Sequence, residues 1–270
     1  MPENEGQWVS VDEAEDVAGS IRHALRAAIF AQEDPQAWKW VLLALHSALQ
    51  GACVCHLTTT AAPIGAVTER NAGEWIDYFA ALRDDPTVKQ PKTYLMALPD
   101  LLKAIRKPHS AGDRSNETGV TLSDAELAWL RRIHDEVRNQ FVHFEPMGWS
   151  LEVSGVPAIG QLIARILREM LDMGWAFRHL EREARAALRA EARIGPIERA
   201  AAGARELAQR HVAALAASPA TGVGRRLPAP AVAIAAARIV AAVCVPALPA
   251  VRLLVGGHSR RSPPRRTLRV

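Results

Sequence analysis

The chain has 270 residues, which allows one domain with an appendage or two small domains. Residues 195–270 contain twelve Arg and two acidic residues, which gives this part a net charge of +10. Because the whole chain has a net charge of +4, residues 1–194 have a net charge of −6. The first part of the chain therefore lacks the basic field that usually marks RNA-binding domains. No stretch has the spacing of a metal site or of a glycine-rich phosphate loop, so we expect no metal and no cofactor. Three Cys and an acidic, polar start without the features of a signal peptide predict a cytoplasmic protein.

The first half of the chain predicts three helices. A capping box at Ser10 and Glu13 and a following apolar face indicate a helix over residues 11–32. Asp34-Pro35 then starts a helix that runs to about Leu57 and is apolar on more than one face, so we expect it at the centre of a bundle. Residues 58–67 predict a loop, and residues 68–83 a shorter helix.

The middle of the chain predicts a broken helix, a loop and the best amphipathic helix of the sequence. Residues 92–106 have helical periodicity, with a kink or a new start at Pro99, and residues 107–119 are polar and predict a mobile loop. Ser123 and Glu126 then form a capping box. Apolar residues follow at helical spacing and form one buried stripe: Leu127, Leu130, Ile133, Val137, Phe141 and Phe144.

After this central helix the pattern changes twice. Trp149–Ser154 alternates apolar and polar residues, which predicts a short strand that either pairs with its copy across a dimer axis or packs as extended coil. From Gly155 a last helix is expected to continue to about Arg193. The predicted fold is an all-α bundle of about four or five helices over residues 8–193, with a short extended segment after the central helix.

Residues 194–270 form an Ala/Arg/Pro-rich basic tail without aromatic residues, which we expect to be disordered. A nucleic-acid-binding tail and a product of a shifted reading frame are the two alternatives. The uncharged runs of the tail are too short to span a bilayer, so we expect no membrane association.

The polar face of the central helix carries the densest group of chemically useful side chains. Asp135, Asn139 and His143 are four residues apart and form one row. Arg131–Asp135 and Arg132–Glu136 have the spacing of ion pairs on a helix. A solvated helix face is the simpler interpretation of this pattern.

The residue types favour a second interpretation. Arg138-Asn139, followed by His143, resembles the R-N-x-x-x-H signature of the HEPN superfamily. The runs 38–51 and 139–157 also resemble a bacterial family of HEPN-like proteins, over roughly residues 10–180. The resemblance implies a small helical bundle, a homodimer with a composite cleft and, in many members, a metal-independent ribonuclease of toxin–antitoxin or defence systems, whose partner is an antitoxin protein.

The chemistry of RNA cleavage fits these residues. Arg138 can stabilise charge on the phosphate oxygens and His143 can move a proton. Asn139 can orient the imidazole or bond a phosphate oxygen, while Arg131 and Arg132 are candidate RNA-binding residues. Arg138 and His143 point about 140° apart on one helix, so a second copy is needed to bring them together. The alternative is a non-catalytic HEPN-like module for dimerisation or ligand binding.

Overall fold

The computed structural model describes residues 11–31, 33–143, 148–151, 153–180, 182–192, 195, 197–200, 202–203, 206, 209 and 253–256. Over these residues the protein is α-helical, as the sequence predicts. Its elements are α1 (Glu13–Phe30), α2 (Ala37–Leu57), α3 (Glu69–Ala81), α4 (Leu98–Ile105), α5 (Asp124–Arg132), the π-helix η1 (Ile133–Arg138), α6 (Asn139–His143), β1 (Gly148–Leu151), α7 (Val156–Met173), α8 (Arg182–Glu191) and β2 (Leu253–Gly256). The described residues therefore hold more helices than the four or five expected.

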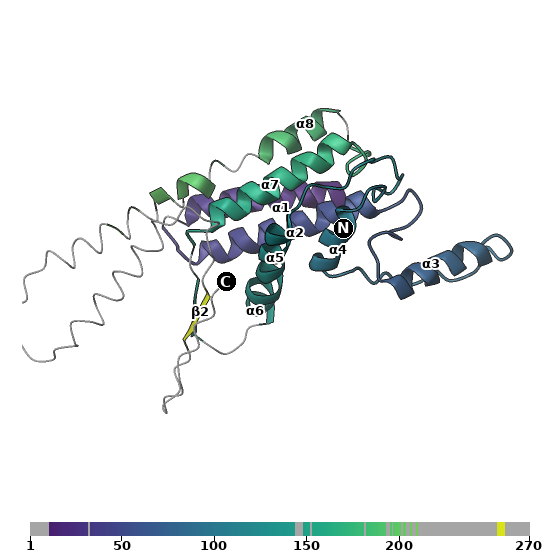
Figure 1. The fold of residues 1–270 in the computed structure, drawn as a ribbon, viewed down its shortest axis with the longest axis horizontal. Helices are drawn as coiled ribbons and strands as arrows, with labels where there is room; N and C mark the ends of the chain where they lie inside the picture. The colour runs from purple at the N-terminus through teal and green to yellow at the C-terminus, as the bar shows by residue number, and fades with distance from the viewer. Residues whose placement is uncertain are drawn as a thin grey trace, which may run out of the picture.

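Helix α2 is the centre of the bundle. It contacts α1, α4, α7 and η1, and Val41, Ala48 and Ala52 on its faces are fully buried. Figure 1 shows α1, α2 and α7 running alongside one another, with α5 and α6 crossing them and α3 extending away from the bundle. Within the described residues α2 is the one helix long and apolar enough to cross a membrane, and 67% of that stretch is buried inside the protein.

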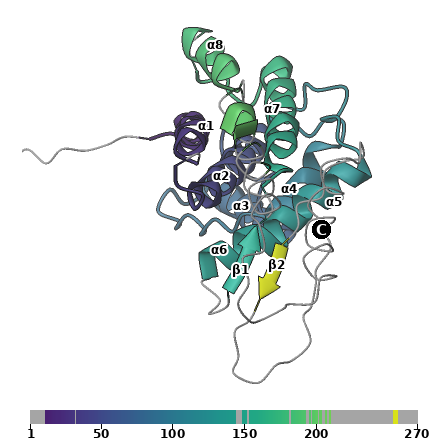
Figure 2. The ribbon, with the colours of Figure 1, turned by 90° about the vertical axis from the view of Figure 1, so that its left-hand side faces the viewer.

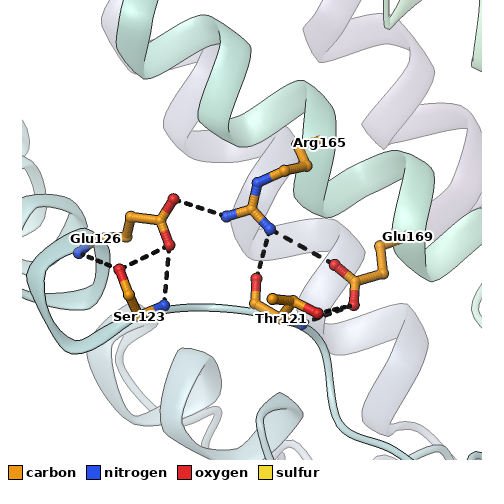
Figure 3. Close-up of polar contacts among 5 residues, drawn as sticks. All are labelled: Thr121, Ser123, Glu126, Arg165 and Glu169. Carbon is orange, nitrogen blue, oxygen red and sulfur yellow. Dashed lines mark hydrogen bonds and ion pairs between the residues drawn. The ribbon is translucent and has the colours of Figure 1, made fainter.

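The central helix begins as predicted. Ser123 accepts a hydrogen bond from the Glu126 backbone N–H, and the Glu126 carboxylate accepts from the Ser123 backbone N–H. Arg165 of α7 then ties this capping box to the core (Figure 3): it donates to Glu126 Oε1 at 2.9 Å and to the Thr121 carbonyl at 2.6 Å. Glu169, one turn further along α7, accepts from the Thr121 backbone N–H and hydroxyl. The start of α5 is thereby fixed against α7.

The helix widens halfway along, which no pattern in the sequence indicates. Over η1 the helix is π-helical, and the Asn139 N–H bonds the carbonyl of His134, five residues back. The predicted stripe is buried at Leu130, Ile133, Val137 and Phe141. Phe144 lies outside the described residues. The π-helical turn η1 is in contact with α2.

Three predicted boundaries are wrong. The capping box of α1 is Asp12 with Glu15, two residues after the predicted pair, and Ser10 lies outside the described residues. Residues 92–97 are not helical, because this segment pairs through Leu95 with Val67, and α4 begins with Pro99 in its first turn. Helix α7 ends at Met173 because Gly174 takes a left-handed conformation (φ 85°), so the helix expected to reach Arg193 is divided into α7 and α8.

The polar loop 107–119, predicted to be mobile, is tied to the end of α2. The Gly112 N–H donates to the His56 carbonyl, and His56 Nε2 lies 3.1 Å from Ser110 Oγ. Within the loop, the Asn116 side chain accepts from the Ala111 N–H. These bonds hold His56, which is fully buried, against the loop.

The predicted extended segment forms β1, which pairs antiparallel with β2 of the same chain, as Figure 2 shows. The sequence left two alternatives for this segment, pairing with a second copy or packing as extended coil. The structure shows neither, because the segment pairs with a strand of its own chain. Ile197 and Ala200 are buried in the core, beyond the predicted end of the helical domain. Most of the tail that was predicted to be disordered lies outside the described residues.

Removing the Arg165 anchor tests this arrangement. Arg165→Met is expected to lower the free energy of unfolding by about 1–2 kcal/mol, because it removes charge-assisted bonds to the half-buried Glu126 carboxylate and to the Thr121 carbonyl. Urea denaturation measures the change. Arg70→Met is the matched control: it removes an exposed ion pair with Glu74 and is expected to cost less than about 0.5 kcal/mol. Equal losses in the two variants would contradict the anchoring role.

Candidate functional site

A pocket of about 600 Å³ lies where the first turn of α1, the middle of α2 and the end of η1 meet. One wall is acidic and comes from α1, with Asp12, Glu13 and Asp16. The floor comes from α2. Gly51 lies on this floor, where a Cβ atom would come within 2.8 Å of the Val17 side chain, so glycine permits the close approach of α1 and α2.

Arg138 brings a permanent positive charge to the lining of the pocket. It is the last residue of η1 and is half-buried. Its Nη1 donates to Asn139 Oδ1 at 2.9 Å. Asn139 therefore orients the guanidinium, a role other than the two that the sequence suggested for it.

Two imidazoles lie close to this guanidinium. His46 of α2 lines the pocket and is 6% exposed. Its Nε2 lies 2.8 Å from Nδ1 of His134 in η1, and the two rings are within 17° of parallel. One ring must donate and the other accept, so the pair shares one proton between these two nitrogens.

Both imidazoles are held neutral at physiological pH. Burial, together with the charges of His134 and Arg138, lowers the pKa of His46 to about 4. Burial is also the main reason that the pKa of His134 is lowered; Arg138 acts in the same direction and Asp135 opposes it. The site thus combines a fixed cation with two neutral, proton-accepting rings.

Of the other residues predicted for the site, Arg131 and Arg132 do not line the pocket, and the side chain of His143 is outside the described part of the chain. Arg131 pairs with Asp135 at 3.3 Å and Arg132 with Glu136 at 3.6 Å, as their spacing predicts. The backbone of His143 ends α6, and its side chain lies outside the described residues. Of the three residues predicted to be catalytic, the structure joins Arg138 and Asn139 by a hydrogen bond between their side chains.

Sequence reasoning missed His134 and the acidic wall of the pocket. His46 and Gln50 are four residues apart on α2 and both line the pocket, which is the one local signal that was available. The contact of His46 with His134 joins residues 88 positions apart, and no spacing rule reaches that far.

The described residues offer neither a metal site nor a reactive thiol. No group of three or more His, Cys, Asp or Glu lies together there in a way that could hold a metal ion. Burial raises the pKa of the Cys53 thiol and raises that of Cys55 to about 12, so both thiols stay protonated inside the core.

Comparisons of the chain with models of protein families, with curated proteins and with solved structures found no match.

The buried histidines predict how stability depends on pH. His46 and His56 both have a pKa of about 4 in the folded protein, against 6.5 for an unperturbed imidazole. Between these values the unfolded chain binds more protons, so stability falls as pH decreases from 6.5 towards 4. From pH 7.5 to 5, where carboxylates remain ionised, we expect a loss of about 2 kcal/mol for each of the two histidines.

Urea denaturation at the two pH values measures this loss. A variant with both His46→Gln and His56→Gln is the control and is expected to lose much less stability over the same interval. An unchanged midpoint for the wild type would contradict the neutral state of the two rings.

Proposed function

We propose that this protein is a metal-independent endoribonuclease of HEPN type that acts as a homodimer. The observation that carries the proposal is the position of Arg138, which lines the pocket beside His46 and is oriented by Asn139. A guanidinium of fixed direction next to neutral imidazoles is what cleavage of RNA by its own 2′-hydroxyl needs.

The reaction assigns a role to each residue. Arg138 binds the scissile phosphate and stabilises the charge that builds on its oxygens. His143 from the partner copy gives a proton to the departing 5′-oxygen. Asn139 holds Arg138 through the bond at 2.9 Å, and Arg131 and Arg132 contact the RNA backbone on either side.

The remaining parts of the proposal follow from the resemblance to HEPN proteins and from composition. The protein acts in the cytoplasm, in a toxin–antitoxin or defence system, with an antitoxin protein as its partner and no membrane association. The burial of α2 supports this last point, since a core helix is as apolar as a membrane span.

A second function, a non-catalytic HEPN-like module for dimerisation or ligand binding, is favoured by one observation. The pocket that Arg138 lines is also lined by Asp12, Glu13 and Asp16, and residues 1–194 have a net charge of −6. This field repels a polyanion, so a polar small molecule with a positive group suits that pocket better than RNA does.

Cleavage assays in the presence of a chelator separate the two functions. We expect the wild type to cut single-stranded RNA without metal, and Arg138→Ala and His143→Ala each to lose about 10²-fold or more in kcat. Asn139→Ala is expected to lose less, since it only frees the guanidinium. Arg70→Ala on α3 is the surface control and is expected to cleave at the wild-type rate.

Mixing the variants tests the dimer. Arg138→Ala and His143→Ala, each inactive alone, are expected to recover roughly a quarter of the wild-type rate together, because half of the dimers then hold one intact composite site. Absence of cleavage by the wild type would leave the ligand-binding module. No recovery on mixing would contradict a site shared between two copies.

A further inference from the structure

We infer that His46 and His134 form a proton relay that carries the proton of the attacking 2′-hydroxyl from the pocket to solvent. The inference rests on the proposed ribonuclease activity and names the group that accepts the first proton. It assigns catalytic contact to His46 and a positioning and relay role to His134, neither of which the R-N-x-x-x-H motif contains.

The geometry of the pair has the direction that a relay needs. His46 lines the pocket, and its bond to His134 uses Nε2, which leaves Nδ1 to meet a ligand. His134 takes part through Nδ1 and is only half-buried, so its second nitrogen, Nε2, is available to pass a proton to solvent. The two nitrogens between the rings are 2.8 Å apart, within the distance for proton transfer along a hydrogen bond.

The electrostatics disfavour the simpler alternative, in which His46 stores the proton. A stored proton would create an imidazolium that is buried and lies near Arg138, and both conditions lower the pKa of His46 to about 4. Passing a proton on as another arrives leaves each ring neutral. Asp135 raises the pKa of His134, whereas Arg138 lowers it. Asp135 therefore favours a proton on His134, the ring from which the proton passes to water.

The 2′-oxygen forms a bond to phosphorus as the bond from phosphorus to the 5′-oxygen breaks. The 2′-hydroxyl proton moves to His46 Nδ1, the proton on His46 Nε2 moves to His134 Nδ1, and the proton on His134 Nε2 moves to water. The 5′-oxygen takes its proton from His143. The relay ends with each ring in its other tautomer, and exchange with solvent restores the first.

Conservative amide variants separate relay from packing. In His46→Gln the amide replaces Nε2, and in His134→Asn it replaces Nδ1, so each variant can keep the contact but cannot pass a proton through the ring. We expect kcat to fall about 10²-fold or more with KM nearly unchanged, and the double variant to fall no further than either single one. The acidic limb of the kcat profile against pH, which reports protonation of the accepting ring, is expected to change as well.

His56→Gln is the matched control for these variants. His56 is also a buried imidazole on α2 with a pKa lowered to about 4, but it bonds Ser110 and does not line the pocket. Its replacement is expected to lower stability and leave kcat unchanged. Wild-type kcat in His46→Gln and His134→Asn, with loss of activity in Arg138→Ala, would overturn the relay alone. An inactive wild type would overturn both the relay and the proposed function.

The tautomers give a test that does not depend on turnover. The relay requires that both rings of the resting protein carry their proton on Nε2. Nitrogen chemical shifts of 15N-labelled histidine, assigned with the two variants, are expected to show this form at pH 7. A resting His46 with its proton on Nδ1 could not accept the substrate's proton there and would overturn the relay.

Discussion

The burial of most of α2 is the constraint on which the rest of the structure depends. A helix that is apolar on several faces has to be covered, and α1, α4, α7 and η1 cover it. Two polar residues of α2, His46 and His56, are buried with it and stay neutral at physiological pH. A chemical property of the site, proton-accepting imidazoles at neutral pH, is thus a consequence of how the core is packed.

The central helix supplies the other half of the site, and two features place it. Its start is fixed to α7 by Arg165, and its middle widens into η1, which lies against α2. This widening places His134 against His46 and brings Arg138 to the edge of the pocket. A π-helical turn costs regular hydrogen bonding, and such turns are frequent where a helix presents functional side chains. The acidic first turn of α1 lines the same pocket and limits which charged ligands can enter.

Local features of this fold could be predicted from the sequence, and distant contacts could not. The capping box at Ser123 and the ion pair of Arg131 with Asp135 depend on residues three or four apart, and both are present. The end of α7 was missed because Gly174 lies inside a pattern that continues as a helix on both sides. At the site, Arg138 and Asn139 stood out through their motif. His134 did not, because its importance comes from an imidazole on another helix.

The central claim is that Arg138 and His46 act on one phosphodiester in one pocket. Its most direct test is a structure of the full chain with a short RNA in which a 2′-O-methyl group blocks the attack. The account predicts a phosphate bound to the Arg138 guanidinium, with the adjacent 2′-oxygen beside Nδ1 of His46. RNA bound on another surface, with this pocket unfilled, would contradict it.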